Sequence, residues 1–159
     1  KNPASSGTGW SFNFPNQDGV HYVMVPYHAN KPHQTLTITY RVSGTGKFVP
    51  SDPCSPNEVG NFRPMLERQG DALTASQEFY RFWGSPVTLA ADGQTHTVTW
   101  ALTYTGWTGV FGKSNQGEFA TTTQNLMGVG ITFGSCMAGH GVYVTGGTAK
   151  FELLNYQIQ

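Results

Sequence analysis

Charged side chains are scarce in this sequence. Asp, Glu, Lys and Arg make up 11% of the 159 residues, and nine basic residues balance nine acidic ones, so the formal net charge is zero. Proteins that bind nucleic acid or anionic lipid through electrostatics need a basic surface. The charge balance therefore argues against nucleic acid as a partner.

Long hydrophobic runs are also missing. No apolar stretch approaches the roughly 20 residues that a membrane-spanning helix needs, so we expect no membrane partner. Apolar residues do not recur at spacings of three and four over any long segment, which argues against a helical protein. Only two short helical turns are expected, within residues 71–78 and 118–124.

The composition also argues against a disordered chain, because disordered chains combine high net charge with few aromatic residues. Aromatic residues reach 13% here, and 159 residues suffice for one hydrophobic core. We predict a flexible lead-in or linker remnant over residues 1–9 (KNPASSGTG) and a single domain over residues 10–159. We expect this domain to be a monomer.

Short alternating strands fill the rest of the chain. The plainest is TLTITYRV at residues 35–42, where Leu36, Ile38 and Tyr40 alternate with threonines. This period of two, with turn residues between the segments, is typical of antiparallel sheets. About ten such strands predict an all-β, antiparallel two-sheet β-sandwich, and a jelly roll in which the last strand lies near the first.

Cysteine occurs only twice, at Cys54 and Cys136, and no CxxC pattern is present. A disulfide between them would close a loop of about 80 residues and would stabilise the fold by roughly 4 kcal/mol. The alternative is two unpaired thiols. We predict the disulfide, because an unpaired thiol in an exposed loop is a liability outside the cell.

Three parts of the chain resemble a known family. The segments GWSFNF and AKFELLNYQI and the aromatic-rich middle are similar to the jelly-roll carbohydrate-binding modules of secreted polysaccharide-degrading systems. The resemblance implies secretion, binding of a polysaccharide or oligosaccharide, and often a structural calcium. It also implies a ligand site on the concave sheet or on the loops at one edge.

The stretch from Arg63 to Trp83 combines charge with aromatic rings more densely than the rest of the chain. Period two places Arg63, Met65 and Glu67 on one strand face, and Arg81 with Trp83 on a face of the next strand. Such mixed polarity suggests a lined groove that grips sugar by stacking and paired hydrogen bonds. The alternative is a ladder of ion pairs, such as Arg63–Glu78 or Glu67–Arg81. The predicted ligand-binding residues are Arg63, Glu67, Gln69, Asp71, Tyr80, Arg81, Trp83 and Trp107.

Two other functions remain open at this point. A small jelly-roll glycoside hydrolase or polysaccharide lyase would use Glu67 with Glu78, or an Arg-assisted base. A structural or adhesive module, such as a surface-protein or phage-fibre domain, would present a broad apolar patch instead of a groove. Binding without catalysis is the favoured interpretation. The five histidines are scattered without an HxH pair, so no metal ligands are predicted.

Overall fold

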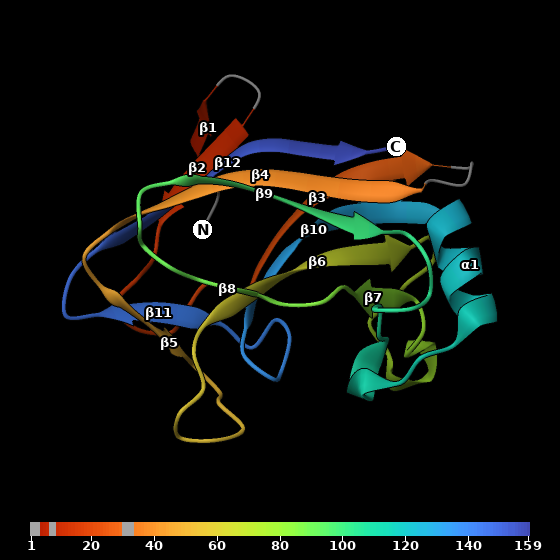
Figure 1. Ribbon diagram of the computed structural model, residues 1–159. Coiled ribbons are helices and arrows are strands. Elements are labelled where there is room, and N and C mark those ends of the chain that lie inside the picture. The colour runs from red at the N-terminus through yellow and green to blue at the C-terminus, as the bar shows by residue number, and fades with distance from the viewer. Residues whose placement is uncertain (1–3, 7–8, 30–33) are drawn as a thin grey trace.

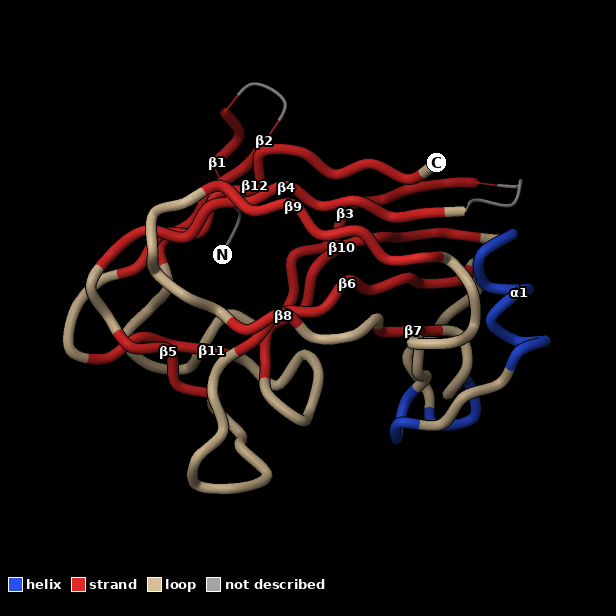
Figure 2. The backbone as a smooth tube through the Cα atoms, viewed as in Figure 1, coloured by secondary structure: helices blue, strands red, loops and turns tan. Residues whose placement is uncertain are grey.

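Two antiparallel sheets packed face to face form the body of the protein. The computed structural model describes residues 4–6, 9–29 and 34–159, and Figures 1 and 2 show the two layers. One sheet has the order β1-β2-β12-β4-β9, and we call it the upper sheet. Its strands are β1 (Ala4–Ser6), β2 (Gly9–Asn13), β12 (Ala149–Ile158), β4 (Thr35–Gly44) and β9 (Thr95–Ala101).

The other sheet, which we call the lower sheet, has the order β3-β10-β6-β7, with β8 also paired to β6. Its strands are β3 (Tyr22–Ala29), β10 (Leu126–Gly134), β6 (Asn61–Arg68), β7 (Arg81–Trp83) and β8 (Val87–Thr88). A separate two-stranded sheet joins β5 (Lys47–Pro50) to β11 (Val142–Thr145). This small sheet lies at the end of the sandwich away from the helix (Figure 1).

The predicted alternation explains the core between the two sheets. Along β4, Leu36, Ile38 and Val42 are each 0% exposed, while the intervening threonines are partly exposed. Phe151 of β12 pairs with Phe12 of β2, and their rings stack with centroids 5.7 Å apart. The predicted two-sheet antiparallel sandwich with a jelly-roll arrangement is therefore confirmed, and so is the pairing of the last strand beside the first long one.

Within the described residues, the helical structure lies at the edge of the lower sheet near β7 (Figure 1). It comprises α1 (Gln116–Gln124) and two single turns, η1 (Ala75–Gln77) and η2 (Val110–Gly112). Helix α1 begins at Asn115, whose side chain accepts a hydrogen bond from the Glu118 backbone N–H. Glu118 in turn pairs with the guanidinium of Arg68 at 2.7 Å, which fixes the helix to β6.

Two strands differ from the sequence-based expectation. Strand β5 was not expected, and it pairs with the predicted strand at residues 142–144. Within the predicted lead-in, Ala4–Ser6 pairs with β2, whereas residues 1–3 and 7–8 lie outside the described residues. The domain boundaries stay a prediction. None of the described helices is long and apolar enough to cross a membrane.

Candidate functional site

The outer face of the lower sheet carries side chains of mixed polarity. On β6, Phe62 and Leu66 are buried in the core, so the alternate residues Arg63, Met65 and Glu67 point outward. The predicted hairpin is present: β6 and β7 pair antiparallel. Met65 lies opposite Trp83 and Glu67 lies opposite Arg81, which aligns their side chains in two rungs across the sheet.

Glycine on β10 lowers the middle of this face. Gly128 lies between Glu67 and β3 and Gly130 between Met65 and Met24 in the strand register. A Cβ at Gly130 would collide with the backbone oxygen of Val23 and with the sulfur of Met24, and one at Gly128 would lie 2.8 Å from a Glu67 carboxylate oxygen. The side chains of Met24 and Glu67 therefore occupy space that a larger residue on β10 would take.

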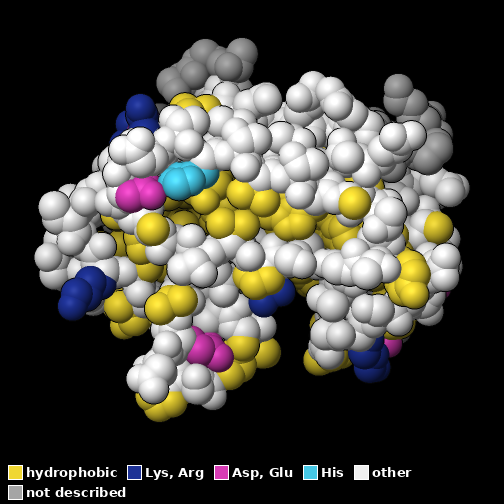
Figure 3. Space-filling view, viewed as in Figure 1, with side chains coloured by type: hydrophobic (Ala, Val, Ile, Leu, Met, Phe, Trp, Pro, Cys, Tyr) yellow, Lys and Arg dark blue, Asp and Glu magenta, His cyan; other side chains and the backbone are white. Residues whose placement is uncertain are grey.

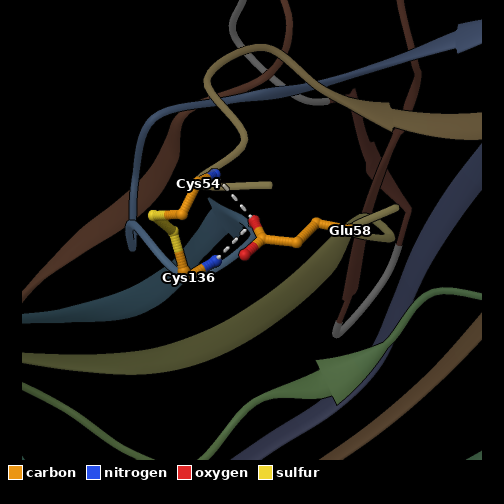
Figure 4. A group of neighbouring side chains, drawn as sticks. All are labelled: Cys54, Glu58 and Cys136. Atoms are coloured by element: carbon orange, nitrogen blue, oxygen red, sulfur yellow. Dashed lines mark hydrogen bonds between the residues drawn. A yellow bond between two sulfur atoms is a disulfide. The ribbon is translucent and has the colours of Figure 1, made fainter. Parts of the chain in front are cut away.

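One wall of the resulting groove is a loop cross-linked by the predicted disulfide. Cys54 and Cys136 are bonded, with their Cα atoms 6.2 Å apart, so the disulfide prediction is confirmed. Figure 4 shows the Glu58 carboxylate accepting hydrogen bonds from the backbone N–H groups of Cys54 (3.0 Å) and Cys136 (3.4 Å). The groove-facing part of this wall comprises Cys136, Met137, Ala138 and His140.

The opposite wall presents two exposed apolar side chains on strained backbone. Leu73 is 67% exposed with φ 58°, and Phe111 is 74% exposed with φ 65°. Residues other than glycine rarely adopt positive φ, and such outliers cluster at functional sites. The loop holding Leu73 is pinned by Gln77, which accepts from the Ala72 N–H and donates to the Gly70 carbonyl.

Together the sheet face and the two walls enclose an open groove of about 950 Å³. Figure 3 shows a hollow between two lobes at the lower edge of the view. A volume near the upper end of the range for ligand sites, roughly 300–1,000 Å³, suits an extended ligand. The lining is mostly apolar, and its charged side chains, if histidine is left aside, are Arg63, Glu67 and Arg81.

Charge is distributed unevenly along the groove. At one end, the Nε atom of Arg81 lies 2.9 Å from an Asp71 carboxylate oxygen, and Glu67 faces Arg81 across the strand pair. Burial raises the pKa of Glu67 above its ordinary value, the charge of Asp71 raises it further, and the charge of Arg81 opposes both. This end therefore holds two carboxylates and one guanidinium.

The other end of the groove is lined by Arg63 and Tyr22, which flank Thr132 in one rung across β6, β10 and β3. Thr132 is 1% exposed, and neither its hydroxyl nor the Arg63 Nε has a hydrogen-bond partner within the part of the chain that the structure describes. The indole N–H of Trp83 is likewise without a partner among the described residues. Buried polar atoms are normally satisfied, and two of these unsatisfied groups, Arg63 and Trp83, belong to residues that line the groove.

Four of the eight predicted ligand-binding residues line the groove, namely Arg63, Glu67, Arg81 and Trp83. Gln69 is exposed but does not line the groove. Asp71 has a fully buried side chain and acts through Arg81. The Tyr80 ring is covered by the guanidinium of Arg68, whose central carbon lies 3.6 Å from the ring centroid.

Trp107 requires a correction as a stacking platform. It is 1% exposed, its indole N–H donates to the Ala101 carbonyl at 2.8 Å, and its ring packs 5.7 Å from that of Phe119. A ring enclosed on both faces cannot stack on a sugar. The exposed ring of the segment TGWTGVFG is Phe111, four residues later.

The predicted catalytic pair, Glu67 and Glu78, does not face across the groove. Glu78 precedes β7, ion-pairs with Lys113 at 3.0 Å and does not line the groove. The two ion pairs considered as the alternative, Arg63–Glu78 and Glu67–Arg81, are not formed. Glu78 pairs with Lys113 and Arg81 pairs with Asp71 instead. Glu67 is thus the only carboxylate in the lining formed by the described residues.

Several lining residues escaped the sequence-based prediction, including Tyr22, Leu73, Phe111 and Met137. Tyr22 and Met137 come from segments far from residues 63–83, so only the strand order brings them to the groove. A weak signal existed for Phe111, because it lies between Gly109 and Gly112 in the same glycine-rich segment as the predicted ligand-binding residue Trp107.

The structure suggests no ligand set for a metal. The one cluster of potential side-chain ligands among the described residues is Cys54, Glu58 and Cys136, and both sulfur atoms belong to the disulfide. His96 and His140 pair with Asp92 and Asp52 instead of converging. His33 and the side chain of His28 lie outside the described residues. The structural calcium implied by the family resemblance stays a prediction.

This chain is similar to a known protein in structure but not in sequence. No protein-family model matches the chain, and no curated protein is significantly similar to it in sequence. A solved structure described as a xylan-binding module CBM15 is similar, with a TM-score of 0.46 and 14% identity. The match covers 96% of this chain and 82% of that one. It is a similarity of chain path alone.

Proposed function

We propose that this protein binds an extracellular polysaccharide or oligosaccharide without catalysis, in the groove on the outer face of the lower sheet. The observation that carries the proposal is the composition of this groove. Exposed apolar groups stand at its walls, and its floor carries polar atoms of Arg63 and Trp83 that have no hydrogen-bond partner among the described residues.

Sugars need both kinds of group. The C–H face of a pyranose packs on apolar rings, and its hydroxyls form hydrogen bonds with planar polar side chains. Phe111 and Tyr22, which are 74% and 49% exposed, offer ring faces on opposite sides of the groove. Arg63, Glu67 and Arg81 supply donors and acceptors between them.

Binding without hydrolysis is favoured because the described lining of the groove contains a single carboxylate, Glu67. The usual glycosidase mechanism needs two carboxyl groups on either side of the scissile bond. Glu67 has no second carboxylate facing it in the described lining, because Asp71 is fully buried beside Arg81 and Glu78 is paired with Lys113.

Secretion is supported by the disulfide, since such bonds persist in oxidising compartments. We propose that the protein acts as a monomer.

Affinity electrophoresis against soluble glucans, xylans, mannans and uronic-acid polymers tests the binding function. We expect retarded migration on at least one polymer, and a loss of affinity of about tenfold or more in Phe111→Ala. Tyr104→Ala is the matched control, because Tyr104 is also exposed (43%) but does not line the groove. Unchanged mobility on every polymer would overturn the proposal, and so would reducing ends released by the wild type but not by Glu67→Gln.

A further inference from the structure

Arg63 is a cation without an anion. The other two arginines of the lower sheet, Arg68 and Arg81, each pair with a carboxylate, at 2.7 and 2.9 Å. No carboxylate of the described residues lies within 4.0 Å of Arg63, which donates only to the Ser135 carbonyl at a long 3.4 Å. A partly buried charge with no counter-charge destabilises the ligand-free protein.

The neighbouring charged groups do not compensate for it. Glu58, on the disulfide wall, accepts from the backbone N–H groups of Cys54 and Cys136. His140 of the same wall lies 3.0 Å from Asp52. Glu67 lies four residues after Arg63 on β6, with Met65 between them on the same face. About 13 Å of strand therefore separates Arg63 from Glu67. Burial lowers the pKa of the Arg63 guanidinium, which still remains charged at neutral pH.

Hydroxyl groups complete the rung around this guanidinium. Thr132 lies directly opposite Arg63 in the strand register, with Tyr22 beyond it on β3. The Thr132 hydroxyl is buried without a partner among the described residues, and the Tyr22 hydroxyl would meet a Cβ at Gly139, which places it against the disulfide wall. Arg63 and Tyr22 both line the groove, and a guanidinium fork with a hydroxyl donor in the same rung is a suitable set for a carboxylate, whose two oxygens accept paired hydrogen bonds.

We propose that the Arg63 end of the groove is a subsite for the carboxylate of a uronic acid residue in the bound glycan. This inference rests on the proposed function, and it narrows the ligand to acidic polysaccharides. The opposite end, where Glu67 and Asp71 outnumber Arg81, repels such a carboxylate and takes neutral sugar units. The acidic residue is therefore bound at one fixed position.

Carboxyl reduction provides the test. Glucuronoxylan, polygalacturonate and alginate are each compared with their carboxyl-reduced forms, in which a primary alcohol replaces the acid, by calorimetry and affinity electrophoresis. We expect wild type to bind at least one acidic polymer about tenfold or more tightly than its reduced form. Arg63→Met should remove this preference, so that the acidic and reduced polymers bind the variant with equal affinity. Methionine keeps most of the side-chain volume, so the variant should still fold.

Two further variants separate charge from packing. Arg63→Lys keeps the charge but loses the planar fork, so we expect an intermediate preference. Arg41→Met is the matched control on the upper sheet, where Arg41 pairs with Glu152, and its preference should equal that of wild type. Raising the salt concentration to about 0.5 M should weaken binding of the acidic form to wild type and leave Arg63→Met unaffected.

Each contrary result has a distinct meaning. Equal affinity for acidic and reduced polymers would overturn the uronic-acid subsite and leave carbohydrate binding intact. A preference that persists in folded Arg63→Met would also overturn it, because another residue would then bind the acid. Absence of binding to both forms of every polymer would overturn the proposed function itself.

Discussion

Phe111 combines exposure with an unfavourable backbone conformation. Its φ of 65° lies in the left-handed region, which costs a residue with a side chain about 1 kcal/mol or more relative to glycine. The ring contributes little to the core in return, because it is 74% exposed. Strain retained at an exposed aromatic residue is consistent with selection for ligand contact.

Phe111→Gly should therefore stabilise the fold while it weakens binding. For a domain of this size, 1 kcal/mol corresponds to a rise in Tm of about 2–4 °C. Differential scanning calorimetry measures the stability, and affinity electrophoresis measures the binding. An unchanged affinity, or a Tm below that of wild type, would contradict the assigned role of this residue.

Glu67 should make stability depend on pH in a defined direction. Its folded-state pKa lies above the ordinary value of 4.5, so the folded protein binds this proton more tightly than the unfolded chain does. The resulting stabilisation is complete below the unfolded-state pKa and is lost as the pH rises through the raised folded-state value. Relative to wild type, Glu67→Gln should gain stability as the pH increases from about 4 to 7.

Glu152→Gln is the control of opposite sign. The Arg41 and Lys150 side chains lower the pKa of Glu152 in the folded state. Its ionised form therefore stabilises the fold above the unfolded-state pKa, and this contribution is lost as the pH falls. Glu152→Gln should be less stable than wild type near neutral pH, with the difference shrinking in acid. Parallel Tm profiles for the two variants would refute both assignments.

For single residues, the sequence predicted the positions of strand side chains better than those of loop side chains. Alternation along RPMLER correctly placed Arg63 and Glu67 on the face away from the core. Period two does not extend into loops, so it could not rank Trp107 against Phe111 in the same glycine-rich segment. Tyr80 was misplaced because it precedes β7, and its ring is used by Arg68 instead.

Among the structural elements, the disulfide wall depends most on a single bond. The bridge joins two loops separated by 82 residues in sequence. Because it restricts the conformational entropy of the unfolded chain, it stabilises the folded state by roughly 4 kcal/mol. The backbone N–H groups of both cysteines also donate hydrogen bonds to the Glu58 carboxylate, which adds to the stability of the same wall.

The double variant Cys54→Ser/Cys136→Ser should lower Tm by about 8–16 °C and weaken polysaccharide binding. Dithiothreitol should lower the Tm of wild type by a similar amount and leave that of the variant unchanged. Thermal melts with and without reductant measure both effects. A variant with full affinity would show that the wall does not depend on the bridge.

The strand order explains why the sequence predicted only some of the residues that line the groove. The hairpin of β6 and β7 was predictable because its partners are close in sequence. Tyr22 and Met24 reach the groove only because β10 inserts between β3 and β6, which no local pattern reveals. The fold class was easier to predict, because alternation over many strands is a property of the entire chain.

For the whole molecule, we expect one cooperative unfolding unit that begins at β2. Trp10 of β2 stacks on Phe151 of β12, with centroids 5.8 Å apart, whereas β1 is an edge strand that pairs with β2. Removal of residues 1–8 should leave Tm within about 3 °C of the full-length value and keep a single transition. Equal calorimetric and van't Hoff enthalpies would establish this cooperativity, and a large fall in Tm would place the lead-in within the folded domain.

The unlike ends of the groove have a consequence for orientation. A glycan chain is itself directional, with a reducing and a non-reducing terminus. On the proposed binding mode, a cleft that is cationic at Arg63 and anionic at Glu67 and Asp71 would select one of the two ways in which the polymer can thread. An acidic polysaccharide bound in this way would always direct the same terminus toward Arg63.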